Sequence, residues 1–289
     1  MQMRLTRSFS TAPRPHIEWH RFTPRAVIPQ AHPLLLIHGF ACGLNDWGAV
    51  PRIIATRSKR EVLSFDNRGI GQSGTPPGPY SVAAMASDAL HVLDAAGVER
   101  AHVMGISLGG MIAQELALRD PSRVQSLILG CTSHGGADAQ PPAAHFVSLS
   151  EAWASEAAPN ESDRVDEFMR LMLPAVALEA PAGRTLLTKF KASFLETARS
   201  SAGLHAQLAA VAPFDSAPRL GGIACPALVI AGNEDAVVSP ANARSLAARL
   251  PRARLRLWEG AGHFWWATRP LEAAELLSSF LTECDGSPD

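Results

Sequence analysis

The sequence has little of several features that mark other classes of protein. Its 289 residues include four cysteines and one tyrosine, and the formal net charge is −1. The cysteines are widely spaced and form no C-x-x-C pair, which predicts reduced, mostly buried thiols rather than a disulfide framework. The near-neutral charge provides no basic surface for nucleic acid or an anionic membrane. The longest apolar runs have the length of strands, so we predict no membrane-spanning helix.

Signals for metals and cofactors are also missing. The ten histidines include no H-E-x-x-H or other ligand spacing, so we predict no metal. Residues 69–74 do spell G-x-G-x-x-G after a strand-like segment. A dinucleotide fingerprint must open directly into a helix, and the prolines of Thr75–Pro79 forbid one. No nicotinamide or flavin is therefore expected.

Strand-like and helix-like segments alternate over most of the chain. This pattern predicts an α/β fold with a mostly parallel central sheet and helices on both faces. Ser81 is the predicted N-cap of a helix that reaches Ala96 and ends at Gly97, and a helix over 108–119 is stopped by Asp120-Pro121. The strands expected after the N-terminal region are residues 33–37, 61–65, 101–104, 124–129, 225–232 and 255–258.

A long helical segment interrupts this alternation. No strand-like run occurs from Gly135 to Pro213, where prolines separate helical stretches. We predict a helical cap over residues 135–213, inserted into a core made of residues 31–134 and 214–289.

The N-terminal region, residues 1–30, is expected to hold an extension and the first strand. Residues 1–25 contain five arginines and a single acid, Glu18, as in a mitochondrial transit peptide. The alternation of apolar and polar residues over His16–Phe22 instead favours a first edge strand. We expect a cytoplasmic protein, with the mitochondrial matrix as the alternative.

The most informative motif is G-x-S-x-G at residues 105–109, between a strand-like and a helix-like segment. Its glycines let the backbone bend sharply, so that the hydroxyl of Ser107 stands above the sheet. The helix that follows points its positive end at charge developing beside Ser107. This context predicts a serine nucleophile.

A serine nucleophile needs a base and an orienting carboxylate, and both follow at strand ends. Asn233-Glu234-Asp235 comes after the strand that ends at Gly232, and His263 lies on a Gly-rich loop after the strand that ends at Trp258. The order Ser107, Asp235, His263 differs from that of chymotrypsin-type and subtilisin-type proteases. The sequence therefore predicts a catalytic triad.

The segments 38–47, 65–76, 105–110, 232–235 and 262–263 together resemble the α/β-hydrolase superfamily in its cap-bearing serine hydrolase branch. The resemblance implies that the backbone N–H groups of Phe40 and Leu108 form the oxyanion hole. It also selects Asp235 over Glu234 by the spacing G-x-x-D and makes His38 a residue that supports the oxyanion loop. The sequence D-x-R-G-x-G-x-S at residues 66–73 is then a structural turn beside the site.

The resemblance implies a reaction through an acyl-enzyme. Ser107 attacks a carbonyl with His263 as base, Asp235 orients His263, and water then releases the acid. The serine excludes the relatives that have an aspartate nucleophile, epoxide hydrolases and haloalkane dehalogenases. Prolyl aminopeptidases usually have a tryptophan where this chain has Leu108.

The substrate class remains broad at this point. The motifs are most similar to those of carboxylesterases and enol-lactonases, which predicts a small or medium carboxylic ester or lactone as substrate. Carbon–carbon hydrolases and cofactor-free haloperoxidases or perhydrolases share the triad and stay open. A ligand receptor on the same fold is the alternative outside enzymes. Candidate pocket residues are His38, Trp153, Trp265 and Trp266, with further apolar cap residues at Phe146, Phe168, Met169 and Met172.

Overall fold

The computed structural model describes residues 3–9, 15–155 and 161–286. Its centre is an eight-stranded sheet with the order β1-β2-β4-β3-β5-β6-β7-β8. β1 and β2 are antiparallel to their neighbours, whereas β4, β3, β5, β6, β7 and β8 run parallel. The strands are β1 (Arg4–Phe9), β2 (Glu18–Thr23), β3 (Leu34–Ile37), β4 (Val62–Phe65), β5 (Ala101–Ile106), β6 (Val124–Gly130), β7 (Ala227–Gly232) and β8 (Ala253–Trp258).

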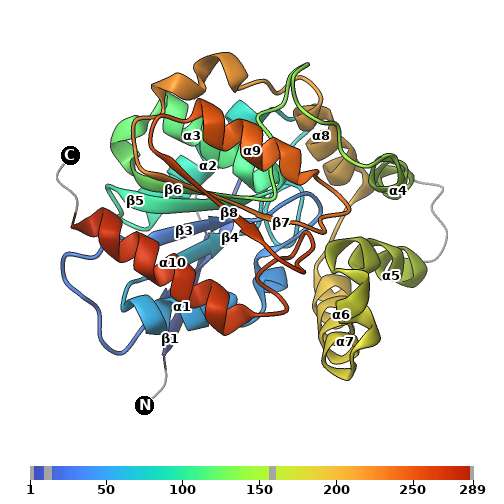
Figure 1. Ribbon diagram of the computed structural model, residues 1–289, viewed down its shortest axis with the longest axis horizontal. Helices are drawn as coiled ribbons and strands as arrows, with labels where there is room; N and C mark the ends of the chain where they lie inside the picture. Colours follow the sequence, from blue (N-terminus) through green and yellow to red (C-terminus); the bar gives the residue numbers. More distant parts are fainter. Residues whose placement is uncertain (1–2, 10–14, 156–160, 287–289) are drawn as a thin grey trace.

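Helices cover both faces of the sheet, as Figure 1 shows. α1 (Val50–Ser58) and α10 (Pro270–Asp285) lie on one face, and α2 (Val82–Ala95), α3 (Leu108–Arg119) and α9 (Pro240–Arg249) lie on the other. The inner strands β3, β4, β5, β6 and β7 are buried along their whole length, because helices cover both faces. The predicted α/β fold with a mostly parallel sheet is confirmed.

The predicted ends of two helices are also confirmed. The Ser81 side chain accepts a hydrogen bond from the Ala84 N–H, which caps α2, and Gly97 follows that helix with a φ of 66°. α3 spans Leu108–Arg119 as predicted and ends before Pro121.

The strand expected over His16–Phe22 forms as β2, but it is not the edge of the sheet. β1 pairs with it in antiparallel register, from Arg4 opposite Thr23 to Phe9 opposite Glu18. The prediction was wrong because β2 does not have one exposed polar face. Glu18 is 2% exposed, since Arg7 pairs with its carboxylate and its backbone N–H donates to Ser73.

An insert of helices between β6 and β7 forms the lobe at the right of Figure 1. It consists of α4 (Ala144–Ala154), α5 (Glu161–Met172), α6 (Ala175–Glu179), α7 (Pro181–Glu196) and α8 (Ser201–Val211). We call these five helices the cap. Its own core contains an aromatic stack in which Trp153, Phe168 and Phe194 contact one another at centroid distances of 5.1 to 5.3 Å.

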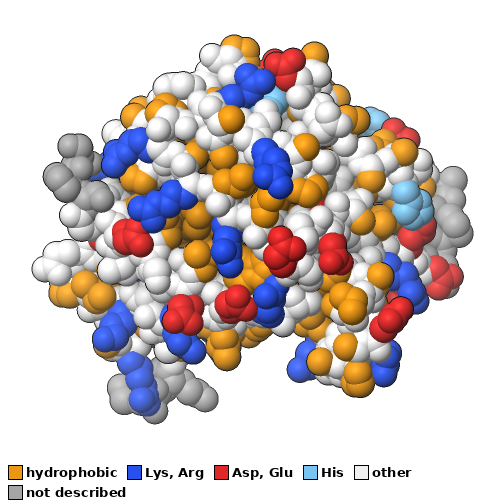
Figure 2. Space-filling model, in the orientation of Figure 1, with side chains coloured by type: hydrophobic (Ala, Val, Ile, Leu, Met, Phe, Trp, Pro, Cys, Tyr) orange, Lys and Arg blue, Asp and Glu red, His pale blue; other side chains and the backbone are white. Residues whose placement is uncertain are grey.

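The distribution of charged side chains and the state of the cysteines agree with what the composition predicts. Acidic and basic side chains are interspersed over the face shown in Figure 2, and the α6–α7 part of the cap stands out at the lower right. All four cysteines are free, and three of them are buried. Within the described residues, no helix is long and apolar enough to cross a bilayer.

Candidate active site

Ser107 lies in a sharp turn between β5 and α3. Its backbone φ of 55° and ψ of −121° belong to a conformation that residues other than glycine rarely adopt. The flanking glycines are required by close contacts: a Cβ at Gly105 would lie 2.0 Å from the Gly109 carbonyl oxygen, and one at Gly109 would lie 2.1 Å from the Ile37 carbonyl oxygen. The turn thus packs the start of α3 against β3 and leaves the Ser107 side chain at the carboxyl end of the sheet.

Asp235 and His263 meet at the same edge of the sheet. The His263 Nδ1–H donates to Asp235 Oδ2 over 2.8 Å, and the two side chains are 4% and 0% exposed. The other carboxylate oxygen accepts from the N–H groups of Val237 and Val238. These bonds hold the ring so that Nε2 is available for a proton. Glu234 is exposed, which leaves Asp235 as the acidic partner.

The loop after β3 approaches the Ser107 turn. A Cβ at Gly39 would lie 3.1 Å from Ser107 Cβ, so only glycine allows this approach without displacement. Within residues 3–9, 15–155 and 161–286, the N–H groups of Phe40 and Leu108 have no hydrogen-bond acceptor in the protein. Two such donors beside the same serine hydroxyl form a candidate oxyanion hole.

His38 supports this loop from below. It is 0% exposed, and its Nδ1 accepts a hydrogen bond from the Gly39 N–H over 2.8 Å. Its ring contacts Trp47 at a centroid distance of 4.4 Å. Burial, with a smaller contribution from His263, lowers the pKa of His38 to about 3. The ring is therefore neutral near pH 7. Because its pKa is so low, it is too weak a base to serve as a second one.

Two cavities open at Ser107. A small one of about 10 Å³ is lined by Ser107, His263, His38, Gly39, Phe40, Cys42, Ile106, Phe146, Phe168, Met172 and Phe264. A large one of about 400 Å³ extends from Ser107 and Leu108 between α4, α8 and residues 135–142. Phe40 and Phe146 line both cavities, and their rings contact edge to face at 6.4 Å. Burial raises the pKa of Cys42 well above its ordinary value, so this thiol remains protonated.

The tryptophans predicted for the pocket line neither cavity. Trp265 and Trp266 are 0% exposed: Trp265 packs on Trp258, and Trp266 packs on Trp47. Trp153 belongs to the aromatic stack of the cap. The loop after His263 turns the rings of Trp265 and Trp266 toward the core, and Trp153 of α4 packs inside the cap, so none of the three reaches a cavity. Met169, unlike Phe146, Phe168 and Met172, also lies away from the cavity walls.

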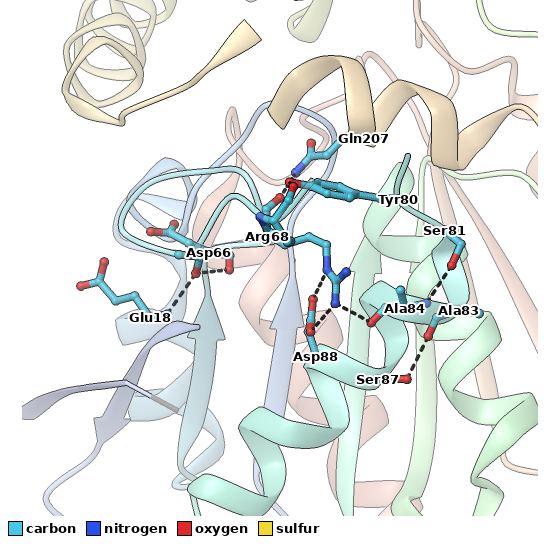
Figure 3. Close-up of polar contacts among 12 residues, drawn as sticks. Glu18, Asp66, Arg68, Tyr80, Ser81, Ala83, Ala84, Ser87, Asp88 and Gln207 are labelled. Atoms are coloured by element: carbon cyan, nitrogen blue, oxygen red, sulfur yellow. Dashed lines mark hydrogen bonds and ion pairs between the residues drawn. The ribbon is translucent and has the colours of Figure 1, made fainter. Parts of the chain in front are cut away.

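Residues 66–74 form a turn that braces the site, and no helix follows until Val82. Asp66 Oδ1 accepts from the Leu44 N–H and Oδ2 accepts from the Gln72 N–H, and burial raises the pKa of Asp66 to about 7. Figure 3 shows the side of this turn that faces α2 and α8. There Arg68 forms a bidentate ion pair with Asp88, and Gln207 of α8 donates to the Arg68 carbonyl oxygen.

The cap is joined to the oxyanion loop by contacts that the sequence did not reveal. Gln207 Oε1 accepts from the Ala41 N–H, and Arg199 Nε donates to the Ala41 carbonyl oxygen. Arg199 also pairs with Asp46 at 3.3 Å, with both side chains 1% exposed. Arg199 and Asp46 are separated by 153 positions, so only the tertiary fold brings them together. The position of the oxyanion loop thus depends on the cap.

Two groups of side chains have the types and spacing of metal ligands in the described part of the chain. They are Cys131, Asp235 and His263 at the site, and His32, His102 and Asp285 at the opposite edge of the sheet. In both groups the carboxylate already accepts a hydrogen bond from a histidine. In the second group Asp285 is also paired with Arg60 at 3.0 Å, and this cation disfavours another positive ion.

Comparison with known proteins agrees with this geometry. Residues 32–269 match the α/β hydrolase fold family. The chain belongs to this family. It is 32% identical to "Putative carbamate hydrolase RutD" of Azorhizobium caulinodans over 253 residues, which cover 88% of this chain and 92% of the relative.

Solved structures of this family superpose over nearly the whole chain. A hydrolase from Pseudomonas aeruginosa PA01 is 30% identical with a TM-score of 0.79, covering 95% of this chain and 98% of that chain. Est816, an N-acyl homoserine lactone degrading enzyme, is 28% identical with a TM-score of 0.76, covering 94% of this chain and 100% of that chain. The chain is thus an α/β-fold hydrolase, and the names of its relatives do not agree on one substrate.

Proposed function

We propose that this protein is a serine hydrolase that cleaves a small to medium carboxylic ester or lactone through an acyl-enzyme. One observation supports this above all others: His263, held by Asp235 at 2.8 Å, lines the same cavity as Ser107 in its strained turn. A nucleophile and a base on one cavity, with a carboxylate that orients the base, are the groups that acyl transfer needs.

The proposed reaction begins when Ser107 Oγ attacks the carbonyl carbon and His263 Nε2 accepts its proton. The N–H groups of Phe40 and Leu108 stabilise the oxyanion, and Asp235 stabilises the imidazolium. His263 then gives the proton to the leaving oxygen, and the C–O bond breaks. Water, activated by His263, attacks the acyl-enzyme and restores the Ser107 hydroxyl with release of the acid.

Carbamate hydrolysis is the second candidate, because RutD is 32% identical over most of this chain. A carbamate offers the same carbonyl to the same nucleophile and oxyanion hole, so the triad alone does not separate the two substrates. Parallel assays with a phenyl carbamate and the matched phenyl ester distinguish them by the ratio of their kcat/KM values.

The direct test is intact-mass labelling with a fluorophosphonate. We expect one phosphonyl adduct on the native protein and none on the folded Ser107→Ala variant, because only an activated hydroxyl displaces fluoride. Absence of an adduct on folded native protein would contradict the proposed nucleophile and would favour a ligand receptor on this fold.

A further inference from the structure

The two cavities at Ser107 differ greatly in size, and each faces a different group of the candidate site. The small cavity is lined by His263, and the large one by Leu108 and Met111 at the start of α3. Because His263 must protonate the leaving oxygen, the alcohol part of an ester has to lie on the side of the small cavity. The acyl part then extends into the large cavity.

The volumes set a limit for each part of the substrate. About 10 Å³ is close to the room that one water molecule needs, whereas about 400 Å³ is within the range of small-molecule sites. Large side chains line the small cavity, among them Phe146, Phe168 and Phe264. This side can hold the hydrolytic water or an alcohol of similar size, but not a bulky one.

Phe146 is the cap residue that lines both cavities. It extends from α4, lines both spaces and contacts Phe40 of the oxyanion loop. Its neighbour Val147 lines the large cavity alone. The two positions therefore offer a matched pair of substitutions on one helix.

Ser150, one turn further along α4, gives the large cavity a buried polar group. It is 1% exposed, and within the described residues its Oγ has no hydrogen-bond partner. Most other residues lining this cavity are apolar, including Met111, Phe146 and Leu208. A buried hydroxyl without a partner is costly, so a ligand that supplies one gains affinity.

We infer that the preferred substrates are open-chain esters of methanol-sized alcohols with a medium-length apolar acyl chain that carries one hydroxyl or oxo group. The inference rests on the proposed function and narrows it. Phe146 restricts the alcohol, and Ser150 binds the polar group of the acyl chain.

The test measures kcat/KM for two ester series. Among methyl esters, we expect a rise of about fourfold per methylene from acetate until the chain fills the cavity. Between methyl octanoate and butyl octanoate, we expect a fall of at least about 100-fold, because three methylenes have no room beside His263. Equal rates for the two octanoates would overturn the inference. Absence of turnover with every ester would instead contradict the proposed function itself.

Substitutions at Phe146 and Val147 test the division between the cavities. Phe146→Ala is expected to reduce the penalty for butyl octanoate by at least about tenfold, whereas Val147→Ala leaves the methyl-to-butyl ratio within about twofold. An equal shift in both variants would overturn the role of Phe146. The wild-type series decides the main point even if a variant does not fold.

The Ser150 part is tested with methyl octanoate and its 3-, 5- and 7-hydroxy derivatives. We expect at least one hydroxylated ester to exceed the parent by about fivefold in kcat/KM, the gain of one hydrogen bond. Ser150→Ala should remove this gain, so that the ratio of kcat/KM for the hydroxylated ester to kcat/KM for methyl octanoate falls to about one. If no hydroxylated ester gains, the polar part of the inference is wrong.

Discussion

In the part of the chain that the structure describes, serine, histidine and aspartate come together at both ends of the parallel strands. At the carboxyl edge, under the cap, lie Ser107, His263 and Asp235. At the opposite edge, His102 of β5 bonds Ser126 Oγ at 2.7 Å and Asp285 Oδ1 at 3.0 Å. Asp285 ends α10, on the side of the molecule away from the cap (Figure 1). The same three residue types thus occur in two very different surroundings.

The backbone and the access to solvent differ first. Ser107 has a positive φ and lines two cavities, whereas Ser126 lies within β6, opposite His102 of β5, and is 0% exposed. A serine inside a strand has its neighbouring N–H groups committed to the sheet, so no oxyanion hole forms beside it.

The partners of the two carboxylates differ as well. Asp235 accepts from two backbone N–H groups, and its negative charge remains available to stabilise an imidazolium. Asp285 accepts hydrogen bonds from His102 and His32 and is also paired with the buried Arg60, and these contacts hold its pKa well below the usual range despite burial. The arrangement at Asp285 therefore ties α10 to the sheet, and the comparison teaches that backbone geometry and access, not residue types, make a triad reactive.

The largest expected effect separates the two serines. Ser107→Ala should lower kcat for an ester by about a millionfold, because loss of the nucleophile leaves only the oxyanion hole and binding. Ser126→Ala should keep kcat within about twofold, since its hydroxyl contacts no cavity. Steady-state kinetics on both folded variants decides this. A large loss in Ser126→Ala would break the distinction between the two arrangements.

The two aspartates should fail in different ways. Asp235→Asn is expected to lower kcat by about 10⁴-fold, because an amide does not hold the histidine in the required tautomer. Asp285→Asn should instead lower the free energy of unfolding by about 3 kcal/mol, since it leaves the buried Arg60 without its carboxylate. Kinetics and urea denaturation of both variants provide the readouts. Equal stability losses with unchanged kcat would contradict the assignment.

These contrasts show what the sequence could predict. The strand–turn–helix at Ser107 and the strand ends before Asp235 and His263 are local patterns, so their order along the chain was readable. The arrangement at Asp285 was not, because His102 and Asp285 are 183 positions apart and neither belongs to a local motif.

The pocket predictions failed for a related reason. Trp265 and Trp266 follow His263 directly, but adjacency in a loop does not fix the direction of a side chain. That direction depends on partners such as Trp47 and Trp258, which pack against them only in the folded protein. Likewise, the edge position of β2 was assigned without the register of β1. Short local signals suffice to propose the reacting groups, whereas the residues that line the cavities depend on the tertiary structure.

The pH dependence of the free energy of unfolding tests the group formed by His102, Ser126 and Asp285. Burial lowers the pKa of His102 to about 4, from 6.5 for a free histidine. Between pH 4 and pH 6.5, His102 is protonated in the unfolded chain but not in the folded protein. The free energy of unfolding therefore falls as the pH drops from 6.5 to 4. For a fully buried side chain this amounts to about 3 kcal/mol.

Denaturation curves at pH 6.5 and pH 4 measure this loss. His102→Asn should reduce the difference between the two pH values, because it removes the proton-binding group, while its kcat near pH 7 stays within a few-fold of wild type. His38 contributes in the same direction, since burial lowers the pKa of that ring also. An unchanged difference in His102→Asn would assign the acid sensitivity to other groups.

The smallest expected effect concerns Cys131, the neighbour of Asp235 in the proposed triad. Its Sγ lies within 4.8 Å of the ligand atoms of Asp235 and His263, and burial, followed by the charge of Asp235, raises its pKa well above the ordinary value. A neutral thiol is a weak donor, so Cys131→Ala should lower kcat by less than tenfold. Cys284→Ala, next to Asp285, is the matched control and should leave kcat unchanged. A loss above 100-fold in Cys131→Ala would mean that Asp235 depends on more than its two backbone donors. A small loss would instead show that Asp235 needs only neutral hydrogen-bond donors besides His263, whereas Asp285 is paired with the buried cation of Arg60.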